Sequence, residues 1–347
     1  MSLPPIKLSA PLKNLLSSST APAPSPSREQ LEILFDAIRL QAEERHAHSS
    51  NDKSERDGET VTREKGGDGI WLIVLTGALF ALNALEAIPH LYAYAVRRYA
   101  SAQKRHTFKD AEGNADGLEK DQEMAVWVAG RMREVGLKSA SFMGVPRAIN
   151  CLAALHEAVK TRTPGVIDKL PNRTRRCASP SAFKHSRRVK SMVLCPSSPP
   201  APVSSAQLRE ITPTNLKDFQ DRGKALWDDI YAPHNEKLLL KLGEYHPDLA
   251  IHILTNHYSS LLAPVAQEDL LPTDLDRVEM SVLAVACLRA LGWVGKQVES
   301  HVFGLRKAHA RTGDEEEGWV TSDAGCLWLL GTVDAVVELF RASATQR

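Results

Sequence analysis

Apolar residues recur with a helical period along most of the chain. In EQLEILFDAIRLQAEERH, residues 29–46, the leucines and isoleucines define the apolar face of an amphipathic helix. The same period predicts helices over residues 29–46, 70–85, 123–135, 146–158, 221–242, 248–262, 277–291, 294–310 and 323–342, and another that begins near residue 89. No segment alternates cleanly between apolar and polar positions, as a half-buried strand would. We therefore predict an all-α fold.

Two of these segments are apolar nearly all round. The run IWLIVLTGALFALNAL, residues 70–85, is shorter than the ~20 residues that a membrane-spanning helix needs, and Pro89 follows soon after. The segment RVEMSVLAVACLRAL, residues 277–291, has the same character, and Thr273 before it is the expected N-cap, with Asp276 three residues on as in a capping box. A helix that is apolar on all sides is typical of a core. We expect two central helices and no membrane span.

Composition divides the chain into four parts. Residues 1–28 are rich in Ser, Pro and Ala and carry no acid, which indicates a disordered leader or, as the alternative, a mitochondrial transit peptide. Residues 161–215 are basic, Ser/Pro-rich and aperiodic, which predicts a disordered linker or insertion. Nucleic-acid contact, a nuclear signal and translated non-coding sequence are the alternatives for this stretch. The remaining residues, 29–160 and 216–342, are expected to form two helical units.

Charge and cysteine content exclude several classes of protein. The 347 residues include 43 basic and 42 acidic side chains, so no overall field attracts nucleic acid or an anionic membrane. The five cysteines are odd in number and unpatterned, which favours a reducing compartment over a disulfide scaffold. Solitary cysteines on apolar helices are typical of small core residues. Without a secretory signal or a peroxisomal C-terminal tripeptide, we expect a mitochondrial or cytoplasmic location.

Two segments repeat the same order of features. LTGALFALNALEAIPHLYAYAVR and LAVACLRALGWVGKQVESHVFGLRK each contain an apolar helix that ends in Ala-Leu, a break, and a histidine that opens an amphipathic helix. The first copy breaks at Asn83 and continues at His90, and the second breaks at Gly292 and continues at His301. The echo suggests two related helical units.

The second copy, with ALG followed by a polar turn and ESHV, resembles the carboxymuconolactone decarboxylase and alkylhydroperoxidase D (AhpD) superfamily. GVPRAINCL, residues 144–152, is similar to the glycine-x-proline helix start that follows this unit in decarboxylase-like members. WDDIY and GEYHPDL are similar to the large two-unit fungal branch, which is described as mitochondrial or peroxisomal. The resemblance covers residues 29–160 and 216–340 and implies an AhpD-like helical fold. We also expect a homo-oligomer.

The resemblance points to two kinds of chemistry. Peroxidase members carry a Cys-x-x-Cys pair followed by a histidine, because one thiolate attacks peroxide and the second thiol resolves the sulfenic acid. This chain has no such pair: Cys287 is solitary, and Glu299 and Ser300 stand beside His301. Decarboxylase-like members need no cysteine and no cofactor, and they transfer a proton beside a lactone carboxylate. The resemblance therefore favours cofactor-free acid/base chemistry on a small organic acid or lactone.

Such chemistry needs a base and a positive group for the anion. The candidates are His301 as the base, Glu279 as its partner, and Arg289 or Arg277 as the positive group. If the two helices form an antiparallel hairpin, a rise of ~1.5 Å per residue leaves Glu279 and His301 roughly 6 Å apart along the axis. As the alternative, Glu279 pairs with Arg277 or Arg306 and has a structural role.

A metal site is not expected. His252 and His257 are five residues apart, so on an α-helix their side chains would point about 140° away from each other. Three classes of function remain: an acid/base enzyme, a non-catalytic helical protein that keeps the fold for assembly, and a redox protein that uses lone cysteines with an external thiol. The residues leave open whether the chain is an enzyme.

Overall fold

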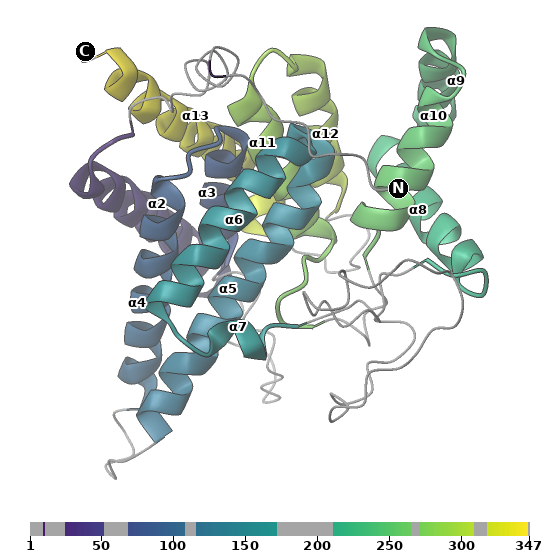
Figure 1. Cartoon of the computed structure of the whole chain (residues 1–347). Helices are drawn as coiled ribbons and strands as arrows, with labels where there is room; N and C mark the ends of the chain where they lie inside the picture. Colours follow the sequence, from purple (N-terminus) through teal and green to yellow (C-terminus); the bar gives the residue numbers. More distant parts are fainter. Residues whose placement is uncertain are drawn as a thin grey trace.

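The computed structural model describes residues 10, 25–51, 69–107, 116–171, 211–264, 271–308 and 318–345. Every regular element among these residues is a helix, so the all-α prediction is confirmed. The first part of the chain forms α2 (Arg28–Asn51), α3 (Ile70–Ala81), α4 (Ala87–Thr107), α5 (Asp116–Met143), α6 (Val145–Arg162) and α7 (Val166–Lys169) (Figure 1). The second part forms α8 (Leu216–Tyr231), α9 (Asn235–Tyr245), α10 (Leu249–His252), the π-helix η3 (Ile253–Leu262), α11 (Arg277–Leu291), α12 (Gly295–Ala308), the short 3-10 helix η6 (Trp319–Thr321) and α13 (Asp323–Thr345). Among these helices, none is both long and apolar enough to cross a membrane.

The centre of the fold is the contact between α3 and α11. Every residue of α3 is buried, and α11 is buried along most of its length. A glycine permits the close approach of the two helices: a Cβ added at Gly77 would lie 3.0 Å from Cδ1 of Leu283 and 3.4 Å from Sγ of Cys287. The Cys287 thiol donates to the carbonyl oxygen of Gly77 at 3.6 Å. Both helices are apolar nearly all round because each is surrounded by other helices.

The helices around this contact follow a repeated plan. In the first set, α2 to α5, α2 packs on α4, and α3 packs on α4 and α5. In the second set, α8 and α11 to α13, α8 packs on α12, and α11 packs on α12 and α13. Each central helix also contacts the last helix of the other set, since α11 packs on α5 and α13 packs on α3. The breaks that follow the central helices both contain positive φ angles, 55° at Asn83 and 76° at Gly292. The echo in the sequence therefore corresponds to several contacts that both sets share, whereas the α2–α3 and α4–α5 contacts have no counterpart of similar extent among the described helices of the second set.

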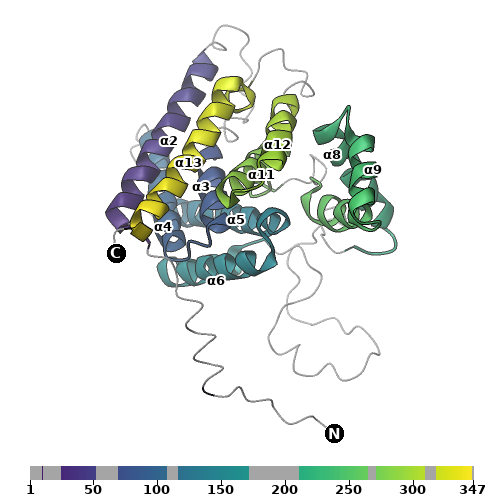
Figure 2. The same ribbon diagram turned by 90° about the horizontal axis from the view of Figure 1, so that it is seen from above.

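The two sets of helices share one hydrophobic core, which includes buried residues from α2 through α13. Each set also has its own additions. α6 covers α4 and α5, whereas α9, α10 and η3 follow α8 in the second set, and η3 packs on both α8 and α5. In both views α8 and α9 lie at the opposite side of the molecule from α2 and α13 (Figures 1 and 2). The interior of the chain is therefore one packed body with a helical extension on one side.

The boundaries of the first set differ in part from the prediction. α2 begins at Arg28 with a reciprocal cap, in which Ser27 and Gln30 each accept from the other's backbone N–H. At the other end, packing continues beyond residue 160: Val166 is fully buried, and the Thr163 hydroxyl lies 2.6 Å from Oη of Tyr92. The linker boundary predicted at 161 is therefore too early, because α7 packs on α5 and α6. Residues 172–210, and the leader up to 24 apart from residue 10, lie outside the described residues.

Candidate functional site

A cavity of about 400 Å³ lies where the helical extension meets the main body. Its wall is formed by side chains of α5, α8, α9, η3, α11 and α12, so both sets of helices contribute to it. Most of the wall is apolar or aromatic, and the groups that can exchange hydrogen bonds or protons are Ser141, Tyr231, His257, Tyr258, Lys296, Gln297, Ser300 and His301. A cavity of this size with a few polar groups is typical of sites for small organic molecules.

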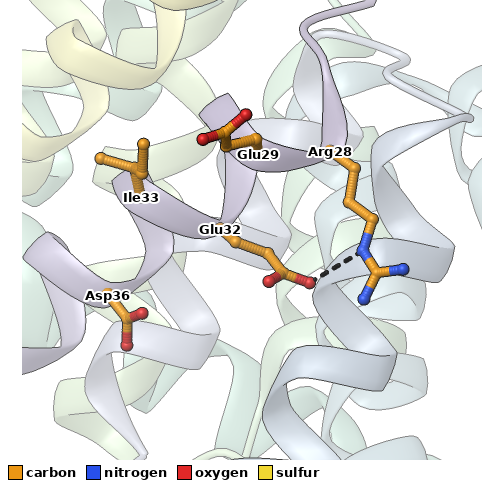
Figure 3. Close-up of a pocket in the computed structure, with 5 residues that line it drawn as sticks. All are labelled: Arg28, Glu29, Glu32, Ile33 and Asp36. Carbon is orange, nitrogen blue, oxygen red and sulfur yellow. Dashed lines mark hydrogen bonds and ion pairs between the residues drawn. The ribbon is translucent and has the colours of Figure 1, made fainter.

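A second depression, on α2, does not have these properties (Figure 3). All of its lining residues come from this one helix, and the charged side chains of Arg28, Glu32 and Asp36 already have partners. Arg28 and Glu32 form an ion pair at 3.0 Å, which Figure 3 shows, and Arg98 pairs with Asp36 at 2.8 Å. This depression is a solvated helix surface.

His301 is the most unusual side chain of the cavity wall. The residue is only 6% exposed, and the edge of its ring meets Phe142 with the ring centroids 5.7 Å apart. Nε2 lies 3.4 Å from Oη of Tyr231, whereas Nδ1 is buried without a hydrogen-bond partner among the described residues. Burial, together with the positive charge of Arg277, lowers the pKa of His301 to about 4. The imidazole is therefore neutral at neutral pH and can accept a proton.

Two tyrosines extend the contacts of His301 into the wall. Oη of Tyr231 lies 3.0 Å from Oη of Tyr258, so the three side chains form a continuous polar chain inside an aromatic cluster that also contains Trp227. Burial raises the pKa of Tyr231, and it raises the pKa of Tyr258 well above its usual value. Both hydroxyls therefore stay protonated and can donate hydrogen bonds. Tyr231 is the last residue of the WDDIY segment.

The π-helix η3 places two histidines differently from the prediction. The rings of His252 and His257 are 5.3 Å apart and meet edge to face. The expected separation of about 140° assumed an α-helix. In a π-helix the backbone pairs residues five apart, so such residues lie on nearly the same face. The expected divergence of these side chains was therefore wrong. Within the described part of the chain, no group of three His, Cys, Asp or Glu residues is placed to hold a metal ion.

The two ends of the cavity differ in electrostatic character. Ser141 and Phe142 come from the last turn of α5, where the helix dipole leaves partial negative charge. Lys296 and Gln297 come from the first turn of α12, where the dipole is positive. Lys296 is mostly exposed and pairs with Glu299 at 2.9 Å, so the two charges largely offset each other at the rim and the helix dipole is what distinguishes this end. An anionic group is favoured at the α12 end of the cavity.

Glu279 does not join His301. Asp276 is the N-cap of α11, and Glu279 completes the capping box by accepting from the backbone N–H of Asp276, so the predicted N-cap Thr273 is one turn too early. The other carboxylate oxygen of Glu279 accepts from Arg131 of α5, which also donates to the carbonyl of Asp274. Burial raises the pKa of Glu279, while Arg131 acts in the opposite direction. Glu279 therefore has a structural role, but the expected partners Arg277 and Arg306 were wrong, because its cation is Arg131 from the first set of helices.

The predicted positive groups are also placed elsewhere. Arg289 is exposed and forms a two-pronged ion pair with Asp334 of α13, at 2.8 and 2.7 Å, and it does not line the cavity. Arg277 lies close enough to lower the pKa of His301, but its guanidinium is bound by Asp229, by Ser281 and by the carbonyl of Gly304. The structure therefore separates His301, Glu279 and Arg289.

The cysteines of the described residues are core side chains, as predicted. Cys151 and Cys287 are fully buried, and Cys326 is 5% exposed. Burial raises the pKa of Cys151 to about 12 and also raises that of Cys287. Neither thiol is therefore ionised at neutral pH, as attack on a peroxide would require. Cys177 and Cys195 lie outside the described residues.

No family model, no curated protein and no solved structure matches the chain. The resemblance to the AhpD-like superfamily accordingly stays a prediction. His301, the base predicted from the sequence, lines the cavity, and so does Gln297, one helical turn before it. It missed Ser141, Tyr231 and Tyr258 because the contacts of these residues join helices distant in sequence. A tyrosine at the end of the WDDIY segment was the available signal.

Proposed function

We propose that the chain binds a small, largely apolar organic acid or lactone in the cavity beside His301 and carries out cofactor-free acid/base chemistry on it. The observation that carries the proposal is the His301 imidazole, which is buried in the wall of an apolar cavity with Nδ1 unpartnered among the described residues. A buried polar atom without a partner is costly. Nδ1 is also covered from solvent, so a ligand oxygen or hydroxyl reaches it through a small shift of the cavity wall, and that contact would remove this cost.

The wall supports a ligand with one apolar part and one anionic or carbonyl group. Aromatic and aliphatic side chains such as Trp227 and Leu238 suit the apolar part. The first turn of α12, with Lys296 and Gln297, suits a carboxylate or a carbonyl oxygen. The first turn of α12 would thus bind the substrate anion, the role that we predicted for Arg289 from the sequence.

The neutral imidazole of His301 then acts as the proton acceptor. In the free protein a pKa of about 4 makes it a weak base. A bound carboxylate would raise this pKa by Coulomb attraction, since an opposite charge favours the protonated form. The hydroxyl of Tyr231, 3.4 Å from Nε2, would then hold the ring in place. Substrate binding would thus bring the base closer to the range in which it works best at neutral pH.

The test uses His301→Gln, with His156→Gln as the matched control, because His156 is an exposed histidine of α6 remote from the cavity. Binding of benzoate and octanoate is measured by calorimetry, and carbon dioxide release from carboxymuconolactone by mass spectrometry. We expect His301→Gln to lower turnover on the order of 10²–10⁴-fold with the fold intact, and His156→Gln to behave as the parent. No carboxylate binding and no turnover in the parent protein would overturn the proposal and favour the non-catalytic assembly protein.

A further inference from the structure

The same cavity contains a second polar pair. Nδ1 of His257, on η3, lies 3.1 Å from Oγ of Ser141, on α5, and both side chains line the cavity. We propose that Ser141 and His257 form a nucleophile–base pair that accepts the acyl group of a small ester or lactone. A serine within hydrogen-bond distance of a histidine at a cavity wall is the arrangement that activates a hydroxyl for attack.

His257 is placed to accept a proton. Burial, followed by the neighbouring charge of His252, lowers the pKa of His257, so its ring is neutral at neutral pH. With the ring proton on Nε2, Nδ1 is free to accept the hydroxyl proton of Ser141. The imidazolium that forms lies beside the last turn of α5, where the partial negative charge of the helix end stabilises a cation.

Two features hold the pair in this position. The π-helical turns of η3 set where His257 meets α5, and π-helical segments are frequent at functional sites. Nζ of the buried Lys138 donates to the carbonyl oxygens of Leu261 and Leu262 at 3.0 and 3.3 Å, which fixes the end of η3 to α5. Ser141 follows Lys138 by one turn of the same helix. The two partners are therefore carried by helices that are bound to each other.

The reaction balances without a cofactor. Oγ of Ser141 forms a bond to the carbonyl carbon of the ester while its proton moves to Nδ1 of His257. The electron pair of the carbonyl double bond moves onto the carbonyl oxygen, which carries the negative charge of the tetrahedral intermediate. The bond to the leaving oxygen then breaks, and the alcohol takes the proton from His257. Water attacks the acyl-serine, gives its proton to His257, and releases the acid as Oγ regains a proton.

This inference rests on the proposed use of the cavity for a small organic ligand, but it is tested separately. The full-length protein is mixed with p-nitrophenyl butyrate, nitrophenolate release is followed by absorbance, and the acylated residue is identified by peptide mass spectrometry. We expect a butyryl group on Ser141. We expect Ser141→Ala to reduce release on the order of 10²-fold or more, to the uncatalysed background, and His257→Gln to reduce it by at least about 10-fold.

The control is Ser343→Ala on α13, a serine remote from the cavity, which should release nitrophenolate at the parental rate. If Ser141→Ala fails to fold, Ser141→Cys serves instead, and its thiol should be butyrylated at the same position. Full activity in Ser141→Ala, or butyrylation only at other residues, overturns the inference. Neither result bears on carboxylate binding at His301, which is measured independently by calorimetry.

Discussion

The pH dependence of stability offers a direct test of the state of His301. The pKa of His301 is about 4 in the folded protein, against 6.5 for an ordinary histidine. As the pH falls below 6.5, the unfolded chain binds a proton at this position before the folded chain does. The free energy of unfolding therefore decreases between pH 6.5 and pH 4, and this loss is absent above pH 6.5.

The size of the effect follows from the difference between the two pKa values. His301 is only 6% exposed, so solvent screens its titration little. At about 1.4 kcal/mol per pKa unit, the free energy of unfolding should fall by about 3 kcal/mol at this site when the pH falls from 7 to 4. Glutamine at position 301 does not titrate, so this part of the loss disappears in His301→Gln. Other histidines with a lowered pKa, such as His90 and His257, contribute equally to both proteins and cancel in the difference.

The assay is urea denaturation followed by circular dichroism at pH 7, 6, 5 and 4.5, with the parent and His301→Gln side by side. The stability advantage of the parent over the variant should shrink steadily as the pH falls. A difference that stays constant between pH 7 and 4.5 would refute the reasoning, because it would mean that His301 is protonated equally easily in the folded and unfolded chains.

Three further predictions concern the core and the cysteines. Arg131→Met leaves the Glu279 carboxylate buried without its cation, so it should lower the free energy of unfolding by about 3–5 kcal/mol in urea denaturation. Adding Glu279→Gln to this variant should recover part of the loss. If the losses of the two single variants simply add in the double variant, the pairing is contradicted. Gly77→Val places methyl groups against Leu283, so the free energy of unfolding measured by heat and by urea should fall by about 1–3 kcal/mol. An unchanged unfolding midpoint would mean that α3 and α11 are not in close contact. Cys287→Ala should leave turnover and any peroxide reduction nearly unchanged because the thiol is buried and protonated. Loss of a peroxidase activity in this variant would instead favour the redox protein that uses a lone cysteine.

The central helices could be predicted from the sequence because their apolar character is local information. Segments 70–85 and 277–291 are apolar nearly all round, and the structure places them at the centre as α3 and α11. The solitary cysteines Cys151 and Cys287 were predicted as core residues on the same grounds, and both are fully buried.

The candidate site could be predicted only in part, because it depends on contacts between distant segments. The predicted axial distance between Glu279 and His301 does not specify in which direction each side chain points from its helix. In the structure the Glu279 carboxylate caps α11 and pairs with Arg131 instead. The position of His257 depends on a π-helix, whereas the helical period in the sequence suggested an α-helix. The Ser141–His257 contact joins residues that are 116 positions apart.

The central claim is that the cavity beside His301 binds a small organic acid, and the imidazole itself can report on this. The His301 ring signals are followed by nuclear magnetic resonance between pH 3.5 and 8, with and without saturating benzoate, and are assigned by their loss in His301→Gln. The account predicts a pKa of about 4 without benzoate and a clearly higher value with it. An unperturbed pKa in the free protein, or the same titration curve in the presence of benzoate, would contradict it.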